Sequence, residues 1–329
     1  MKHISIIVPN GEAILTSIIS PYKIFMGVNG YLKQKHQTND DFFKIDLVGI
    51  STETKLYNGA FSISPTKLIT DIKKTDLIIV TTLRGDLAGE IENNRPFIPW
   101  IKEQRAKHNT EIASLCMGSF LLAETGLLDG QSCATHWMVA DLFAEKYPAI
   151  NVLPERIINE NNGIYSSGGA FSILNLILYL VGKYWGLEAE VWCSKIYEIE
   201  LDRHNQNQFA IFSGQKNHED QPIIDAQRFI EENYHEKISI EQLANKFAIS
   251  GRNFIRRFKK ATANTPVEYI QRVKVEAAKK SLEMSVNSPI TEVMYDVGYS
   301  DPKAFRNIFR KHTGLSPLEY KKKYVRSTT

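Results

Sequence analysis

Residues 290–317 read ITEVMYDVGYSDPKAFRNIFRKHTGLSP, and this stretch decides how the C-terminal third of the chain is interpreted. It predicts a helix, a tight turn that contains Gly298, and a second helix that Ser300 or Asp301 can cap. Pro302 then stands near the first position of the second helix, where its missing N–H leaves no hydrogen bond unmade. The stretch therefore predicts a helix-turn-helix unit near residues 290–312.

The second helix of this unit has an apolar side and a basic side. Phe305 and Phe309 are four residues apart, and we expect this apolar pair to face inward. The outward positions hold Lys303, Arg306, Asn307, Arg310 and Lys311. A run of charge is also typical of an ordinary solvated helix surface, so the charge alone does not decide what this helix does.

The same pattern occurs a second time, earlier in the chain. Residues 240–250 align with residues 290–300 at an offset of 50, and one extra residue in the later copy makes the offset 51. The matched pairs after that point are Phe254 with Phe305, Phe258 with Phe309, Thr265-Pro266 with Ser316-Pro317, and Glu268-Tyr269 with Glu319-Tyr320. Repetition on this scale predicts two copies of one structural unit, the first near residues 240–261.

The earlier copy has the same division into buried and exposed positions. An apolar stripe at helical spacing precedes the turn and consists of Ile240, Leu243, Ala244 and Phe247. Ser250 can cap the following helix, whose outward positions hold Arg252, Asn253, Arg256, Arg257, Lys259 and Lys260. A predicted helix over residues 266–284 joins the copies. A rigid connector could place two recognition helices about 34 Å apart, so that they enter successive major grooves of DNA.

Charge is distributed unevenly along the chain. The whole sequence of 329 residues has a net charge of +3, but residues 221–329 carry a net +8 and residues 1–220 a net −5. A basic module joined to a mildly acidic one is typical of nucleic-acid binding. A chance excess of basic residues that only keeps the protein soluble would give the same net charges. The polar stretch 206–220 has little to bury, so we expect it to be a surface linker.

The basic part resembles the AraC/XylS-type DNA-binding domain over about residues 221–325, and residues 298–317 carry the match. The resemblance implies that double-stranded DNA is the partner and that bases are read from the second helix of each unit. The positions concerned are Arg252, Asn253, Ile255 and Arg256 in the first unit and Lys303, Arg306 and Asn307 in the second. Arg256 could pair with guanine, Asn307 with adenine, and Ile255 could contact a thymine methyl group.

The first two thirds of the chain read as an α/β domain. Apolar runs at residues 4–8, 43–48, 76–82 and 111–115 predict strands, and helical patterns lie between them, notably at residues 13–28 and 99–107. Alternating strands and helices indicate a mostly parallel sheet covered on both faces, with sites at the carboxyl ends of the strands. Since the sequence has neither a dinucleotide fingerprint nor a phosphate loop, we expect no nucleotide cofactor.

Cys116 stands at the junction of a predicted strand and a helix. Ser114 and Gly118 flank it, which is the layout of a nucleophile elbow, a sharp turn that exposes a reactive side chain. His136 follows 20 residues later and could supply the imidazole of a Cys–His pair. A buried structural cysteine and an ordinary structural histidine are the commoner alternatives, and both stay open here.

The context of Cys116 resembles the DJ-1/PfpI branch of the class I glutamine amidotransferase-like fold, a flavodoxin-like α/β architecture. The segments that carry the resemblance are residues 116–130, 134–137 and 165–170, within a domain at residues 1–205. This domain followed by the AraC-type module resembles the GlxA-type family of transcriptional regulators. Enzymes of the branch pair the cysteine with a glutamate on the helix after the first strand. In this sequence Thr16 aligns with that glutamate, and Glu12 lies one helical turn away.

These departures favour a vestigial Cys116 and His136 and a site that binds rather than converts a small molecule. The residues expected to line it are Thr16, Cys116, Met117, His136, Ser167 and Gly168. Asn175 also stands where relatives of the branch commonly have aspartate. The resemblance implies a homodimeric regulator that senses a metabolite, of the nitrogen-containing kind to which relatives often respond.

Two alternatives remain from the sequence. One is a cysteine-dependent hydrolase or glyoxalase-like enzyme tethered to a DNA-binding module, and the other is an architectural DNA-binding protein that ignores metabolites. Three cysteines cannot all pair and no zinc motif is present, so we expect neither a disulfide framework nor a metal site. The longest apolar stretch, residues 171–181, is too short to cross a bilayer, and we expect a cytoplasmic protein without membrane contact.

Overall fold

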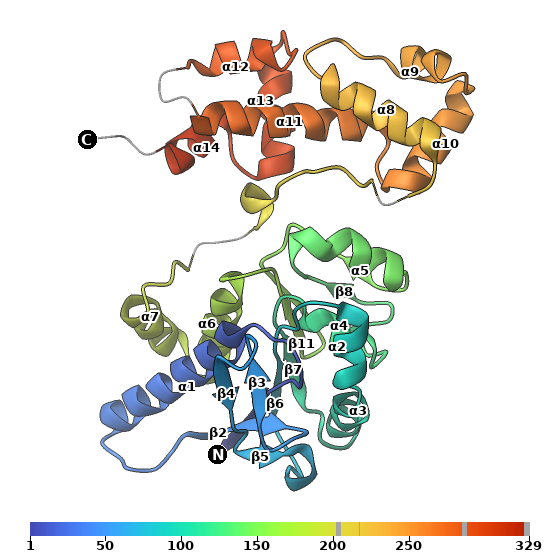
Figure 1. Cartoon of the computed structure of the whole chain (residues 1–329). Coiled ribbons are helices and arrows are strands. Elements are labelled where there is room, and N and C mark those ends of the chain that lie inside the picture. Colours follow the sequence, from blue (N-terminus) through green and yellow to red (C-terminus); the bar gives the residue numbers. More distant parts are fainter. Residues whose placement is uncertain (202–204, 217, 285–287, 326–329) are drawn as a thin grey trace. The chain divides into compact units, whose positions relative to one another are not determined.

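The computed structural model describes residues 1–201, 205–216, 218–284 and 288–325, which form two compact units, Met1–Gln206 and Asn207–Thr329 (Figure 1). Each unit is described by itself. The sequence predicts a domain at residues 1–205, a linker at residues 206–220 and a domain at residues 221–329. Within that predicted linker, Asn217 lies outside the described residues. The N-terminal unit contains an α/β sandwich, and the C-terminal unit is helical.

A sheet of seven strands lies at the centre of the N-terminal unit. Its strands, in spatial order, are β10 (Ile158–Asn161), β11 (Ile164–Ser167), β7 (Glu111–Ser114), β6 (Leu77–Val80), β1 (Lys2–Ile7), β2 (Phe43–Gly49) and β5 (Lys67–Leu68). All neighbours pair in parallel except β10 and β11. Two small pairs lie outside this sheet: β3 (Thr54–Leu56) with β4 (Phe61–Ile63), and β8 (Ser132–Cys133) with β9 (Asn151–Val152).

Helices cover both faces of the sheet (Figure 1). One face carries α1 (Leu15–His36), α6 (Ser172–Trp185) and α7 (Leu187–Ile196). The other carries α2 (Leu87–Asn93), α3 (Phe97–His108), α4 (Gly118–Ala123) and α5 (Ala140–Lys146). The predicted α/β fold with a mostly parallel sheet is confirmed. No described helix combines the length and the apolar character that crossing a membrane would require.

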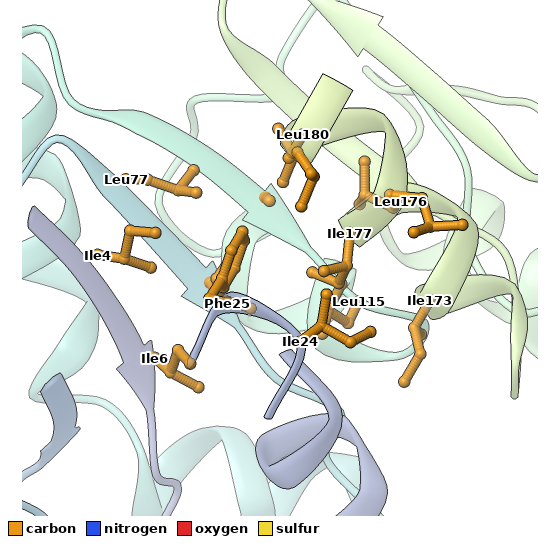
Figure 2. Packing of buried hydrophobic residues seen from close by; sticks show 14 of the residues in the cluster. Ile4, Ile6, Ile24, Phe25, Leu77, Leu115, Ile173, Leu176, Ile177 and Leu180 are labelled. Atoms are coloured by element: carbon orange, nitrogen blue, oxygen red, sulfur yellow. The ribbon is translucent and has the colours of Figure 1, made fainter. Parts of the chain in front are cut away.

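The alternation of side chains along each central strand explains why both faces are covered. Leu77 and Ile79 of β6 belong to the apolar cluster under α1 and α6, whereas Ile78 and Val80 belong to the cluster on the opposite face. Successive side chains of a strand point to opposite faces, so a run of four apolar residues requires cover on both. Figure 2 shows the first cluster, in which Phe25 of α1 lies among side chains of β1, β6 and α6.

Seven α-helices form the described part of the C-terminal unit, after a short 3-10 helix at Asn207–Phe209. They are α8 (Gln221–Glu232), α9 (Ile240–Lys246), α10 (Gly251–Thr262), α11 (Pro266–Met284), α12 (Ile290–Asp296), α13 (Pro302–Thr313) and α14 (Pro317–Tyr324). α11 contributes Ile270 and Val273 to a cluster with α8, α9 and α10, and Val275, Ala278 and Leu282 to a second cluster with α12, α13 and α14. The predicted all-α tandem arrangement, with α11 as the connector, is confirmed.

The segment that precedes α8 differs from the expected surface linker, because residues 207–212 pack against the helices. The ring of Phe212 meets that of Tyr269 edge-on with 5.1 Å between centroids, and its backbone N–H donates to Glu276 at 3.1 Å. Lys279 of α11 donates to the carbonyl of Ala210 at 2.5 Å. Phe212 provides the apolar side chain for this packing. Residues 213–220 are mostly polar, which is why the sequence predicts a surface linker.

Candidate functional site

Cys116 lies in the sharp turn between β7 and α4, as the elbow layout requires. Its backbone is left-handed, with a φ of 54°, which is a strained conformation for a residue other than glycine. Gly118 allows the turn, because a Cβ atom there would lie 2.5 Å from the carbonyl oxygen of Val80 and 2.6 Å from that of Thr81. The beginning of α4 is thereby held directly against the end of β6.

The Cys116 thiol is buried, with 5% of the residue exposed. The backbone N–H groups of Ala170 and Met117 and the hydroxyl of Thr82 face the sulfur and favour the thiolate, but burial outweighs them and raises the pKa of the thiol above its ordinary value. Cys116 is therefore protonated at neutral pH. This differs from an activated cysteine, whose thiolate attacks or binds an electrophile.

His136 lies beside the same turn but is not paired with the thiol. Its Nδ1 accepts a hydrogen bond from the N–H of Met138 at 3.1 Å. Burial lowers the pKa of its imidazole, so that the ring is neutral at neutral pH. The ring packs against Gly169, where a Cβ atom would lie 1.9 Å from the imidazole Cδ2. Among the described contacts, none joins His136 to Cys116.

The loop after β11 brings several of the predicted site residues together. The Oγ of Ser167 accepts a hydrogen bond from the N–H of Cys116 at 3.4 Å, and Met117 follows the thiol at the start of α4. Gly168 continues the loop towards Ala170, whose N–H faces the sulfur. The residues Cys116, Met117, His136, Ser167 and Gly168 thus lie close together around the turn before α4, and their role in binding a ligand stays a prediction.

Thr16 has a different position from the one its alignment suggested. Its side chain is exposed, whereas the neighbouring Ser17 is buried at the start of α1. The Ser17 hydroxyl donates to the carbonyl of Ile14 at 2.7 Å and accepts from the N–H of Thr82 at 3.0 Å. Ser17 thus contacts the Thr82 backbone beside the thiol, and sequence reasoning missed it by one position. The ligand-binding role of Thr16 stays a prediction.

Gln206 is a second residue that sequence reasoning missed. Its side-chain amide is buried: the Nε2 donates to the carbonyls of Thr135 at 2.8 Å and Pro154 at 2.7 Å, and the Oε1 accepts from the N–H of Gly169 at 3.1 Å. These contacts span up to 71 residues of sequence. A lone glutamine at the end of a domain gives no local pattern from which they could be inferred.

The recognition helices α10 and α13 present most of the predicted DNA-binding residues to solvent. The exposed side chains are Arg252, Ile255, Arg256, Lys303, Arg306 and Asn307. Asn253 is half-buried, and its Oδ1 accepts a hydrogen bond from the guanidinium of Arg256 at 2.8 Å. Arg257, which the sequence placed among the outward residues, is instead half-buried and bound to Asp220 by two hydrogen bonds of 2.9 and 2.5 Å. It ties the start of α8 to α10.

The internal repeat is present in side-chain detail. Thr262 and Thr313 each donate a hydrogen bond of 2.8 Å to the carbonyl of the residue four positions earlier. The Phe258–Tyr269 and Phe309–Tyr320 rings both meet edge-on, at 5.3 and 5.4 Å. Each tyrosine hydroxyl donates to a glutamate of a preceding helix, Glu231 or Glu283. Such correspondence confirms that the two helix-turn-helix units are copies of one structural unit.

Lys274 of α11 connects the two copies. Its buried ammonium donates to the carbonyls of Val297 at 2.8 Å and Gly298 at 3.4 Å in the second turn, and to that of Glu236 at 3.2 Å before α9. Burial lowers the pKa of this lysine. One side chain of α11 therefore links the backbone of the first unit to that of the second.

Comparisons with known proteins agree with this division. Residues 30–183 match the DJ-1/PfpI family, and residues 243–323 match a helix-turn-helix domain. The chain joins a DJ-1/PfpI domain to an AraC-type helix-turn-helix domain. Both resemblances found in the sequence are thereby confirmed.

Relatives with a helix-turn-helix domain are named as transcriptional regulators. The chain is 25% identical over 218 residues to GbdR of Pseudomonas aeruginosa, an HTH-type transcriptional regulator, which covers 66% of this chain and 59% of GbdR. It is 24% identical over 292 residues to CdhR of the same organism, also an HTH-type transcriptional regulator, which covers 88% of this chain and 84% of CdhR. The matched region thus spans less than two thirds of GbdR.

The DJ-1/PfpI domain also has solved structural neighbours. A candidate transcriptional regulator from Vibrio parahaemolyticus matches 59% of this chain and 98% of its own, with a TM-score of 0.53 and 22% identity. A ThiJ/PfpI family protein from Pseudomonas syringae matches 61% of this chain and 76% of its own, with a TM-score of 0.50 and 18% identity. At these identities the likeness establishes the fold of the domain.

Proposed function

We propose that this protein is a sequence-specific, DNA-binding transcriptional regulator whose DJ-1/PfpI domain binds a small metabolite. The observation that carries the proposal is the pair of duplicated helix-turn-helix units, each with exposed basic and amide side chains on its recognition helix. The names of GbdR and CdhR as transcriptional regulators support it.

In this proposal, some exposed residues of the two recognition helices contact the bases of double-stranded DNA, and others contact its phosphates. Arg256 has a planar guanidinium that can donate two hydrogen bonds to guanine, and Asn307 has an amide that matches adenine. Lysines and arginines further along the helices, such as Lys259 and Arg310, bind phosphates, which adds affinity without adding sequence preference. Because Lys274 holds the two units together, both helices read one continuous site rather than two independent ones.

The loop around Cys116 is the proposed effector site. It places the buried thiol of Cys116 beside backbone N–H groups and hydroxyls. Such groups suit recognition of a small polar molecule. The resemblance to GlxA-type regulators suggests a nitrogen-containing metabolite. Effector binding changes the affinity of a homodimer for DNA, and a coupling of about 1–3 kcal/mol is typical of such regulation. We place the protein in the cytoplasm, where such DNA and metabolites are available.

An enzymatic role has less support. Burial keeps the Cys116 thiol protonated and the His136 imidazole neutral, so the two do not form the ion pair of an activated nucleophile. Glu12, the nearest acidic candidate in the sequence, directs its backbone N–H to Glu90 at 3.1 Å. Among the described residues, the groups that shift the pKa of the Cys116 thiol are Ala170, Met117 and Thr82, and none of them is a carboxylate. A Cys116→Ala variant that abolished turnover of a reactive carbonyl or amide substrate would support the enzyme instead.

DNA selection tests the proposal directly. The full chain is used to select sites from random duplexes, and Kd is then measured for a selected and a scrambled duplex at the same salt concentration. A regulator prefers its selected site by about 10³-fold or more. Equal affinity for the two duplexes would reject sequence-specific recognition. A metabolite panel that shifts the melting temperature of the full chain would then separate a sensor from an architectural DNA-binding protein.

A further inference from the structure

Gln206 is the last residue of the N-terminal unit, and its side chain is embedded in the proposed effector site. Its amide bridges the backbone of Thr135, directly before His136, and the backbone of Gly169, directly before the Ala170 N–H that faces the Cys116 sulfur. Its own N–H donates to the carbonyl of Glu155 at 2.8 Å. One side chain therefore holds the two loops that surround the thiol.

The glycine pair at residues 168–169 is fitted to this arrangement. A Cβ atom at Gly168 would lie 2.7 Å from the Oε1 of Gln206, and one at Gly169 would lie 1.9 Å from the His136 ring. Neither glycine has the left-handed backbone that would by itself require glycine. The absence of side chains at these two positions therefore makes room for the Gln206 amide and for the imidazole.

The chain leaves the site through this same residue. Asn207 begins the C-terminal unit, and by Ala210 the chain is held on α11 through the ammonium of Lys279. The packing of Phe212 against Tyr269 follows two residues later. Only three residues separate Gln206, which is anchored at the effector site, from Ala210, which is anchored on the DNA-binding helices.

We propose that Gln206 is a positioning residue that couples the effector site to DNA binding. A ligand that displaces the Gly168–Gly169 backbone or the Thr135 carbonyl breaks the hydrogen bonds of the Gln206 amide. Release of that amide frees the residue at which the segment bound to α11 begins. The inference rests on the proposed function, because it assumes that the loop binds an effector and that the helical unit binds DNA.

The test introduces the displacement by mutation, since the effector is unidentified. Gly168→Ala places a methyl group against the Gln206 amide, and Gln206→Ala removes the amide. In the full chain, each change should alter Kd for a selected duplex at least about fivefold and in the same direction. The double variant should resemble Gln206→Ala alone, because the added methyl group then has no amide to displace.

Asn175→Ala provides a matched control within the same unit. It removes another buried amide, whose Nδ2 donates to the carbonyl of Glu200 at 2.6 Å. None of the hydrogen bonds of the described residues joins this amide to the loop at residues 168–170. We expect this variant to lower the melting temperature while Kd stays within about twofold of the wild-type value. If Gln206→Ala fails to fold, Gln206→Met keeps the length of the side chain without its hydrogen bonds and replaces it in the comparison.

Two outcomes would overturn the inference while leaving the proposed function intact. One is an unchanged Kd in folded Gln206→Ala and Gly168→Ala variants, and the other is an equal change in the Asn175→Ala control. Failure of the wild-type chain to prefer the selected duplex would instead contradict the proposed function, and the coupling role of Gln206 would fail with it.

Discussion

The two helix-turn-helix units adopt the same backbone with different residues at its two most demanding positions. The turn is left-handed at Ala248 in the first unit and at Gly298 in the second, with φ of 53° and 73°. The recognition helix then ends in a left-handed residue that is Ala263 in the first unit and Gly314 in the second, with φ of 55° and 76°. The first unit therefore has alanine where the second has glycine.

This difference concentrates backbone strain in the first unit. A left-handed conformation costs a residue with a Cβ atom about 1–2 kcal/mol, whereas glycine adopts it freely. Glycine is also required for a second reason at Gly298, because a Cβ atom there would lie 2.2 Å from the carbonyl oxygen of His235. Duplication thus preserved the backbone, while the packing between the units made glycine indispensable in only one of the two turns.

The largest expected effect comes from making the second turn like the first. Gly298→Ala adds both a left-handed penalty and a collision with backbone, so we expect a loss of about 3 kcal/mol or more in the free energy of unfolding. Urea denaturation of the full chain, with hydrogen exchange at α12 and α13, measures it. A loss below about 1 kcal/mol would show that the turn relaxes and that the units are not tightly joined.

We expect the next largest effect from removing the Lys274 ammonium, which links the two helix-turn-helix units. Lys274→Met keeps the length of the side chain but leaves the carbonyl of Val297 without its ammonium donor, and we expect a loss of about 2 kcal/mol. The exposed Lys280 on the same helix serves as the control, and Lys280→Met should change stability by less than about 0.5 kcal/mol. Equal effects of the two variants would contradict a connecting role for Lys274.

The converse changes should stabilise the first unit. Ala248→Gly and Ala263→Gly each relieve a left-handed alanine, and we expect a gain of about 1 kcal/mol from each, less the entropy that glycine adds to the unfolded chain. Thermal denaturation of the full chain gives the sign. A loss of stability in both variants would show that the alanine side chains contribute packing that exceeds the backbone strain.

A smaller difference depends on pH. His312 of α13 corresponds to Ala261 of α10, and burial, aided by the positive charges of Arg272 and Lys311, lowers its pKa to about 4. Since the unfolded imidazole has a pKa near 6.5, the folded state binds fewer protons between these values. The stability is therefore complete above about pH 6.5 and is lost as the pH falls towards 4.

We expect the wild-type chain to lose about 2 kcal/mol more than His312→Ala between pH 7 and pH 5. Urea denaturation at the two pH values measures this difference. An identical pH dependence in the two proteins would mean that His312 keeps its ordinary pKa in the folded chain.

Local patterns in the sequence were sufficient to predict the architecture. The apolar run at residues 76–82, the Phe305–Phe309 pair and the elbow around Cys116 each depend on neighbours a few residues apart, and each predicted element is present. The repeat added long-range information, because two aligned copies imply one common structure.

The details of the sites depend on contacts that no local pattern encodes. Ser17 rather than Thr16 is the buried hydroxyl at the start of α1, because a shift of one position turns a helical side chain by about 100°. Arg257 is withdrawn from the exposed face by Asp220, 37 residues away. The hydrogen bonds of the Gln206 side chain likewise join loops that are distant in sequence.

Base reading by both units is the central claim, and the most direct test compares Arg256→Ala and Asn307→Ala, one from each unit. Kd of the full chain is measured for the selected and the scrambled duplex at one salt concentration, with Lys259→Ala as a control for phosphate contact. We predict that each of the first two variants loses about 1–3 kcal/mol on the selected duplex and little on the scrambled one. Equal losses on both duplexes, or a loss confined to one unit, would contradict base reading by two recognition helices.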